Sequence, residues 1–465
     1  MNIKTGRAGT PLLALGLMVL SSAAMATNGY FTHGVGTESK GMAGTGVGSD
    51  AANGPIIGAS NPALAVFAED GWEAGLSLFS PMRSFEAGPS LAQGQGGAFT
   101  IGEGSFDSSS EWFPIPHIAK NFRLSGGNVI NFAFYGRGGM NTDWDDSDIT
   151  ATSLACDPLG ATVVTGPGPY CSGPAGVDLM QAFLALNFAG QVNDNFSWGI
   201  GPVFAVQMFE ADGVMSFTPF TKTFAESFIT TGVPAPAENL SNNGRDTSTG
   251  WGFAGGIWWS MGDSFSAGLA YQSKMSMSEF KDYSDLFAEG GGFDIPATTK
   301  LGLSFKGTNN VRLNFDIEHI EYNDIGSVGN PMANLAACPT AGLGGMDLES
   351  CLGGKNGGGF GWEDMTIFKL GLEWYPSEST TYRFGYSYGE QPIQEADVMF
   401  NILAPGVMEQ HFTFGMTKSR SSGSAWNLSL MYAPSNSVKA VSMFDPTQEL
   451  EIEMSQFEIE FSYLW

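Results

Sequence analysis

The C-terminal segment 456–465 alternates between apolar and polar side chains as far as Tyr463, and this pattern restricts the possible fold more than any other feature. Successive side chains of a β-strand point to opposite sides of the sheet, so this segment would form a strand with two different faces. The apolar face comprises Phe457, Ile459, Phe461, Tyr463 and Trp465, and the polar face comprises Gln456, Glu458, Glu460 and Ser462. The pattern predicts that the chain ends in a strand with an aromatic terminal residue.

Segments of about ten residues with the same alternation recur from about residue 72 to the C-terminus, for example over 311–318 and 368–374. A soluble β-sandwich alternates in the same way, and the pattern alone does not tell which face is outward. Some connections are tight, as at 193–195, whereas others are long, as at 212–247. Short turns on one side and long loops on the other are typical of bacterial outer-membrane barrels, and we count about fourteen strands, an even number as such barrels require.

Residues 1–26 have the three-part layout of a secretory signal peptide. Lys4 and Arg7 precede an apolar run of about nine residues, and Ala24-Met25-Ala26 suits cleavage after Ala26. That run is far shorter than the ~20 apolar residues of a membrane-spanning helix, and no comparable run follows it. We therefore expect export of a chain that crosses the membrane with strands.

The composition excludes one class of partner and agrees with many strands and turns. The 47 Asp and Glu residues outnumber the 20 Lys and Arg residues, and the formal charge of −27 repels nucleic acid. Only 14% of the residues are charged, whereas 64 are Gly and 35 are Phe. Such glycine and aromatic contents are high for a soluble globular protein.

The four cysteines form two local pairs, Cys156 with Cys171 and Cys338 with Cys351. An even count with short separations in an oxidising compartment predicts two loop-closing disulfides, with free buried thiols as the alternative. The sequence has no Cys-x-x-Cys motif and no Cys/His spacing typical of a metal site. We therefore expect neither a metal nor a cofactor.

Residues 27–70 lack the alternation and are rich in glycine, with the run from Gly41 to Gly48 at their centre. They form either a disordered leader or a plug, here called the hatch, inside a β-barrel that spans 71–465. A barrel of ~14 strands has a lumen too wide for strand side chains alone to fill, which favours the hatch. The glycine run lacks the preceding strand and following helix of a nucleotide-binding loop.

A series of short motifs is distributed along the chain. They are Asn28-Gly29-Tyr30-Phe31, Lys40-Gly41-Met42-Ala43-Gly44, Asn61-Pro62-Ala63, Trp251-Gly252-Phe253, Tyr271-Gln272-Ser273-Lys274, Ile320-Glu321-Tyr322, Arg383-Phe384-Gly385-Tyr386 and Gln391-Pro392. In their order and spacing, over essentially the whole mature chain, these motifs resemble the FadL-type outer-membrane transporters of long-chain fatty acids and related hydrocarbons.

The resemblance implies a barrel of about fourteen strands whose lumen is blocked by an N-terminal hatch. The Asn-Pro-Ala signature of the hatch corresponds to Asn61, Pro62 and Ala63. The resemblance also implies sideways release of the ligand into the membrane, through a kink in the third strand. The candidate residues for this kink are Gly136, Gly138 and Gly139, because glycine inside a strand often marks a bulge. A strand that simply ends in a glycine turn is the alternative.

The resemblance further implies passive uptake of long-chain fatty acids and similar hydrophobic compounds. Where such relatives place basic residues around the lumen pocket, this chain has Gln207, Glu363 and Glu409. Like charges ~4 Å apart repel by roughly 4 kcal/mol at an effective dielectric constant of 20, so these residues disfavour a carboxylate. Neutral hydrocarbons, either alkanes or aromatics, are therefore the alternative substrates. The candidates for a substitute cation inside the barrel are Lys300, Lys306, Arg312, Lys369 and Arg383.

Phe217, Phe220, Phe224 and Phe228 are three and four residues apart within the long connection 212–247. On a helix, this spacing forms one apolar stripe. An outer loop offers little core for such a stripe to join, and an exposed apolar patch generally marks a binding surface. We expect the four phenylalanines to capture the ligand by burying it, at roughly 0.8 kcal/mol per methylene.

An outer-membrane lipid hydrolase is the alternative from a different functional class. No Gly-x-Ser-x-Gly or His-Glu-x-x-His motif occurs, and the four histidines, His33, His117, His319 and His411, lie in separate segments. We therefore expect a channel without enzymatic activity in the bacterial outer membrane. Its expected partners are the hydrophobic substrate, outer-membrane lipids and lipopolysaccharide, and the barrel-assembly machinery that binds the C-terminal strand.

Overall fold

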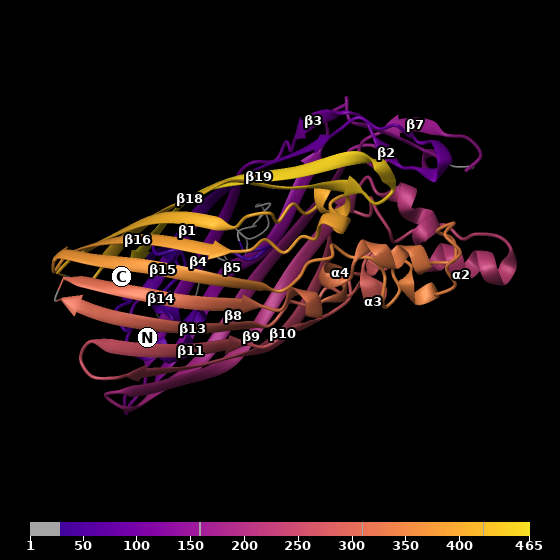
Figure 1. The fold of residues 1–465 in the computed structure, drawn as a ribbon. Helices are drawn as coiled ribbons and strands as arrows, with labels where there is room; N and C mark the ends of the chain where they lie inside the picture. The colour runs from indigo at the N-terminus through magenta and orange to yellow at the C-terminus, as the bar shows by residue number, and fades with distance from the viewer. Residues whose placement is uncertain (1–27, 158–159, 309, 422) are drawn as a thin grey trace, which may run out of the picture.

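The computed structural model describes residues 28–157, 160–308, 310–421 and 423–465, so the expected signal peptide 1–26 lies outside the described residues. Within these ranges, fourteen antiparallel strands form a barrel, which β1 closes by pairing with β19 (Figure 1). The barrel strands are β1 (Trp72–Ala87), β4 (Phe113–Arg123), β5 (Val129–Trp144), β8 (Ala175–Asn193), β9 (Phe196–Asp212), β10 (Asp246–Ser260), β11 (Phe265–Gln272), β13 (Thr298–Thr308), β14 (Val311–Ile320), β15 (Met365–Ser377), β16 (Thr380–Gly389), β17 (Gln410–Ser419), β18 (Ala425–Ser442) and β19 (Asp445–Leu464).

The long connections gather at the end of the barrel opposite the C-terminus (Figure 1). Their short strands are β2 (Thr100–Ile101), β3 (Gly104–Asp107), β6 (Thr150–Ser153), β7 (Val164–Pro167) and β12 (Ser276–Met277). The α-helices of the structure are α1 (Thr37–Lys40), α2 (Lys222–Thr231), α3 (Ala288–Gly291) and α4 (Gly326–Gly329). The 3₁₀ helices are η1 (Pro55–Ala59), η2 (Pro62–Val66), η3 (Gln95–Gly97), η4 (Leu154–Cys156), η5 (Met215–Phe220), η6 (Lys281–Tyr283), η7 (Tyr322–Asp324), η8 (Met332–Ala337), η9 (Leu348–Ser350), η10 (Glu395–Asp397) and η11 (Phe400–Ile402). Among the described residues, no helix has the length and apolar composition needed to cross a membrane.

The alternation along the C-terminal strand β19 places apolar side chains on the outside of the barrel and polar side chains inside it. Phe461 and Trp465 point outward and are 42% and 53% exposed, whereas Glu458 and Glu460 are buried inside the barrel. A soluble sandwich would bury the aromatic face instead. The carboxylates are tolerated inside because the hatch supplies Lys40, whose Nζ lies 2.6 Å from Glu460 and also pairs with Glu458. The polar face of the last strand is therefore a surface that holds the hatch.

The hatch, residues 28–70, lies inside the barrel and packs closely against its wall. The Asp316 carboxylate on β14 accepts hydrogen bonds from the backbone N–H groups of Gly46 and Val47, at 2.8 and 3.0 Å. A Cβ atom on Gly48 would lie only 2.5 Å from the carbonyl oxygen of Gly302 on β13. The glycine-rich composition thus allows the backbone of the hatch to approach the backbone of the barrel.

Asn61, Pro62 and Ala63 form the start of η2 within the hatch. The Asn61 side chain accepts a hydrogen bond from the N–H of Ala63 at 3.0 Å, which caps the helix. Its amide nitrogen donates to the carbonyl oxygens of Val47 at 2.9 Å and Ile257 at 3.3 Å. One buried side chain therefore connects η2 to the glycine run of the hatch and to β10 of the barrel.

Candidate ligand cavity and lateral opening

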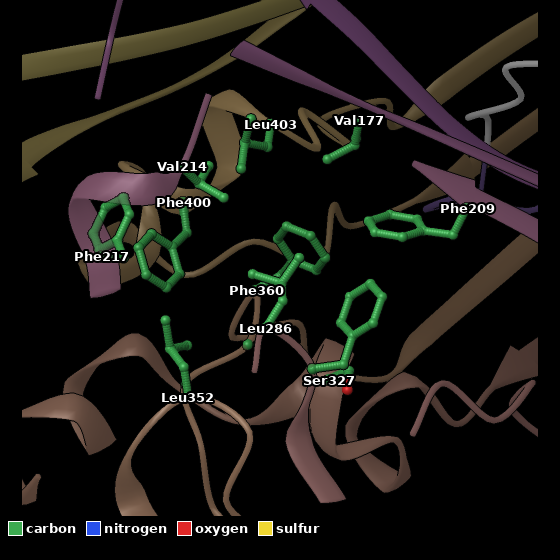
Figure 2. A pocket seen from close by; sticks show the side chains of 13 residues that line it. Val177, Phe209, Val214, Phe217, Leu286, Ser327, Leu352, Phe360, Phe400 and Leu403 are labelled. Atoms are coloured by element: carbon green, nitrogen blue, oxygen red, sulfur yellow. The ribbon is translucent and has the colours of Figure 1, made fainter. Parts of the chain in front are cut away.

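An apolar cavity lies among the outer loops, where the barrel opens (Figure 2). Val177 at the start of β8 and Phe209 near the end of β9 contribute to it from the barrel wall. Phe217 from η5 and Phe400 from η11 contribute from the loops. Ser327 supplies a polar side chain, but its hydroxyl donates a hydrogen bond to the carbonyl oxygen of Gly292. The lining is otherwise made of hydrophobic side chains and glycines.

The cavity is narrow in this conformation. Its free volume is ≈ 50 Å³, compared with the ~150 Å³ of an engineered apolar cavity that binds benzene. A ligand of that size can enter only if some wall side chains move. Leu403, which is 8% exposed, belongs to a loop. Of the five phenylalanines in the lining, Phe209 stands on β9, and the other four belong to loops, namely Phe217, Phe287, Phe360 and Phe400. The loops are therefore the part of the wall that can adjust.

Both expected disulfides, Cys156–Cys171 and Cys338–Cys351, are formed. The second disulfide directly precedes Leu352, which lines the cavity. The N–H of Leu352 donates to the carbonyl oxygen of Phe220 at 2.9 Å, and its own carbonyl accepts from the N–H of Lys222, also at 2.9 Å. The disulfide thus fixes a loop that joins one wall of the cavity to the start of α2.

The four phenylalanines predicted to form one helical stripe are divided between two elements. Phe217 is buried in η5 and lines the cavity, and Phe220 packs against the same core. Thr221 then adopts extended backbone angles and caps α2, so the helical periodicity restarts there. Phe224 is half-buried on α2, and Phe228 is 49% exposed at its outer end. The prediction of a single stripe was wrong because Pro219 and Thr221 interrupt the helix.

The structure does not bring Gln207, Glu363 and Glu409 together in a lumen pocket. Gln207 is buried on β9, where its amide donates to the carbonyl oxygen of Phe293 at 2.7 Å. Glu363 is exposed and shares an outer groove with the lipid-facing side chain of Phe368. Glu409 is half-buried and accepts a hydrogen bond from the N–H of Gln391 at 3.4 Å. The two glutamates precede strands at the barrel rim, which places them outside the pocket.

The cations proposed as substitutes for a carboxylate anchor are largely committed to other carboxylates. Lys369 and Lys300 pair with Glu318 at 2.6 and 3.2 Å. Arg383 pairs with Glu38 of the hatch at 3.0 Å. Arg312 pairs with Asp50, also in the hatch, at 2.5 Å, whereas Lys306 is exposed. Among the described residues, none of these five lines the apolar cavity.

A series of aromatic contacts leads from the cavity down to the start of the hatch. Phe287 lines the cavity and lies 4.9 Å from Phe293, whose ring is 6.1 Å from that of Tyr30. Tyr30 in turn contacts Phe31 at 4.9 Å between ring centroids. Burial raises the pKa of the Tyr30 phenol, and also that of Tyr322 beside it, so both stay neutral. The floor of the cavity is therefore aromatic and uncharged.

The wall below this floor has a gap between β4 and β5. The two strands pair only as far as His117 opposite Tyr135, and β4 continues upward paired with β1 alone. Pro114 and Pro116 lack a backbone N–H, so the upper part of β4 cannot offer a full set of donors. On its other side, β5 shifts register against β8 between Gly136 and Gly138, which is a β-bulge.

The predicted kink at Gly136, Gly138 and Gly139 therefore coincides with a bulge in β5, the third barrel strand. Hatch residues 30–32 lie along the edge that β4 leaves free. The N–H of Thr32 donates to the carbonyl oxygen of Arg137 at 2.8 Å, and the N–H of Gly139 donates to that of Tyr30 at 2.9 Å. The beginning of the hatch thus covers the gap.

Sequence reasoning did not assign a role to Tyr30, Phe31, Phe293 or Arg137, although all four are buried between the cavity and the gap. Three of them come from segments without alternation or from a loop, where no periodicity marks the inward side. Arg137 is flanked by glycines within a strand. Arginine is seldom buried, so an arginine among the glycines of the predicted kink was a signal that could have indicated a role.

Comparisons with known proteins agree with this architecture. Residues 173–419 match the family described as outer membrane protein transport protein (OMPP1/FadL/TodX). Among solved structures, the Pseudomonas putida toluene transporter TodX is 18% identical with a TM-score of 0.61, covering 94% of this chain and 99% of that one. A Pseudomonas aeruginosa FadL homologue is 14% identical with a TM-score of 0.58, covering 94% and 99%. The Ralstonia pickettii toluene transporter TbuX is 14% identical with a TM-score of 0.56, covering 93% and 98%.

A comparison with curated proteins found no match. The family match spans more than half of the chain, and the solved structures share its hatch-filled barrel of fourteen strands. The chain therefore belongs to the OMPP1/FadL/TodX family and is an outer-membrane transporter of hydrophobic compounds, not an enzyme.

Proposed function

We propose that this protein is a passive channel for neutral hydrophobic molecules, with aromatic hydrocarbons and alkanes as its substrate class. The observation that carries the proposal is the lining of the cavity, in which none of the 13 residues is charged. A carboxylate buried there without a partner would lose its hydration at a cost of several kcal/mol. A neutral ligand has no such cost and gains roughly 0.8 kcal/mol for each methylene removed from water.

The names of similar structures support the same substrate class. TodX and TbuX are described as toluene transporters, and CymD, which is 14% identical with a TM-score of 0.50, is described as a monoaromatic hydrocarbon channel. Long-chain fatty acids, which the sequence resemblance implied as the main substrate, are less well supported. A fatty acid would need a cation at the cavity, and the candidate cations lie elsewhere.

On the proposed route, the ligand meets the exposed face of α2, then the apolar cavity, and finally the gap between β4 and β5. Phe228 and Ile229 on the exposed face of α2, 49% and 55% exposed, would capture the ligand from outside. The ligand would then enter the apolar cavity as the loop walls adjust. It would pass Tyr30 and Phe31 and leave sideways through the gap at Gly138, directly into the outer membrane. No energy source is required, since the ligand moves down its own gradient.

The test is uptake of labelled toluene, hexadecane and oleate by cells that lack their own fatty acid channel, with and without this protein. The proposal predicts stimulated uptake of toluene or hexadecane and little stimulation of oleate. Stimulation of oleate alone would refute it.

A pair of variants ties the result to the cavity. Val177→Asp places a carboxylate in the lining and should abolish stimulated toluene uptake. Val441→Asp makes the same change on an exposed valine of β18, 52% exposed, and should leave uptake unchanged. Heat-modifiable migration on a gel would verify that both barrels are folded. Equal loss of uptake in both variants would mean that the cavity is not the transport site.

A further inference from the structure

Arg137 connects two opposite walls of the barrel. It lies at the bulge of β5 and is buried, with its side chain reaching across the lumen. Its guanidinium donates to Gln272 Oε1 at 2.8 Å and to Thr298 Oγ1 at 3.0 Å, and its Nη2 lies 3.4 Å from Glu318 Oε1. These partners stand on β11, β13 and β14, far from β5 in the order of strands around the barrel. The arginine is therefore a strut below the cavity floor.

The same residue holds the part of the hatch that covers the gap. The guanidinium carbon lies 4.3 Å from the centroid of the Phe31 ring, which is within the range of a cation–π contact. The backbone carbonyl of Arg137 accepts the hydrogen bond from the N–H of Thr32 at 2.8 Å. Hatch residues 30–32 are thus attached to Arg137 through both a side chain and the main chain.

Charge neutralisation of Glu318 does not require Arg137. The Glu318 carboxylate also pairs with Lys369 at 2.6 Å and with Lys300 at 3.2 Å. Burying a third cation adds a desolvation cost, which its hydrogen bonds must offset. Of these three cations, Arg137 is the one that contacts both Phe31 and Thr32. Lys369 also reaches the hatch, where its Nζ donates to the carbonyl oxygen of His33 at 2.7 Å. What distinguishes Arg137 from the two lysines is its contact with hatch residues 31 and 32.

We propose that Arg137 is the latch of the lateral opening: by joining the β5 bulge, Phe31 and the Glu318 wall, it holds hatch residues 30–32 over the gap between β4 and β5. The proposal rests on the proposed function, because it takes this gap as the exit for the ligand. To open the gap, Phe31 must leave the face of the guanidinium and Thr32 must leave the β5 edge. Arg137 is a positioning residue for this step and does not need to touch the ligand.

The test measures exposure of the hatch segment without any ligand. Thr32→Cys introduces a thiol at a buried position, and the four native cysteines are all in disulfides. Labelling of this thiol by a maleimide in the full-length protein in detergent reports release of the segment. Adding Arg137→Met should speed labelling on the order of ten-fold, because hydrogen bonds to a charged group are lost. Glu318 keeps Lys300 and Lys369 as partners in this variant.

Lys300→Met is the matched control, because Lys300 pairs with the same Glu318 oxygen as Arg137 but, among the described residues, forms no ion pair with the hatch. It should leave the labelling rate unchanged. Equal acceleration by both substitutions would indicate a general role of the ion pairs and would overturn the latch. Labelling of the Arg137→Met protein at the unmodified rate would overturn it as well.

Phe31→Leu provides an independent variant if Arg137→Met does not fold. It removes only the aromatic face and should also accelerate labelling of Cys at position 32, whereas an unchanged rate would contradict the latch. Toluene uptake is measured in parallel. Suppose that Arg137→Met accelerates labelling, but neither the unmodified protein nor any variant transports toluene. The proposed function then fails, whereas the role of Arg137 in holding hatch residues 30–32 stands.

Discussion

The hatch is predicted to depend on one side chain, Asn61, to a degree that can be estimated from its contacts. Asn61→Ala removes the cap of η2, worth about 1 kcal/mol, and two donated hydrogen bonds, to Val47 and Ile257, worth about 1 kcal/mol each. The total, about 3 kcal/mol, corresponds to local opening of the hatch that is on the order of a hundred-fold more frequent.

Hydrogen exchange of the peptide covering η1 and η2 measures this opening, because exchange of its amides scales with the local opening equilibrium. Asn61→Ala should accelerate exchange on the order of a hundred-fold there and leave peptides from β13 to β15 unchanged. Asn61→Ser keeps a good capping residue but is too short to donate to Val47 or Ile257, which removes about 2 kcal/mol, so it should have an intermediate effect, roughly thirty-fold. Exchange at the unmodified rate in the alanine variant would show that Asn61 does not hold the hatch closed.

Three further predictions concern the loops and the hatch. Replacing Cys338 and Cys351 by serine should release the loop before Leu352 and weaken toluene binding several-fold in a titration, without lowering the melting temperature of the barrel. Phe228→Ser should reduce toluene uptake at low toluene concentrations but not at saturating ones. The exposed side chain is expected to help the ligand bind first at the surface, and this step limits uptake only when toluene is scarce. Burial, with Lys40 and Lys369 nearby, lowers the pKa of His33 to about 3 from 6.5. The unfolded chain therefore binds a proton that the folded one does not, and stability should fall as the pH drops below 6.5, by about 3 kcal/mol at pH 4.5. Unfolding of the His33→Gln variant at the two pH values should lack this contribution.

Each of these three has an outcome that contradicts it. Unchanged toluene affinity after removal of the disulfide would mean that Leu352 is held by other contacts. A loss of saturating uptake in the Phe228 variant would place that side chain in the transport path itself. An identical pH dependence with and without His33 would show that other groups cause the acid sensitivity.

The barrel and the hatch could be predicted because their signals are local and periodic. The alternation over 456–465 follows from the strand geometry, and the membrane explains which face is outward. The glycine-rich run predicted a hatch, and its contacts with Asp316 and Gly302 show why glycine is needed there. The disulfide pairs were local in sequence, so their spacing was sufficient to predict them.

The binding region was harder to predict because it is assembled from distant segments. The predicted single stripe of phenylalanines was wrong because the helix is broken at Pro219 and Thr221, which divides the four residues between η5 and α2. The family resemblance predicts Glu363 at the lumen pocket, but this residue is exposed and lies just before β15, at the rim of the barrel. Arg137 meets its partners on three other strands, and no local pattern in the sequence encodes that meeting.

If a cavity without charge selects neutral molecules, one cation inserted into its lining should change the selectivity. Leu403 lines the cavity and is 8% exposed, so Leu403→Lys adds an ammonium group to the lining. Initial uptake rates of labelled toluene and oleate are measured side by side for the unmodified and substituted proteins. We expect toluene uptake to fall and oleate uptake to rise in the substituted protein. If oleate uptake does not rise, or if the unmodified protein already prefers oleate, then the absence of charge in the cavity does not set the selectivity.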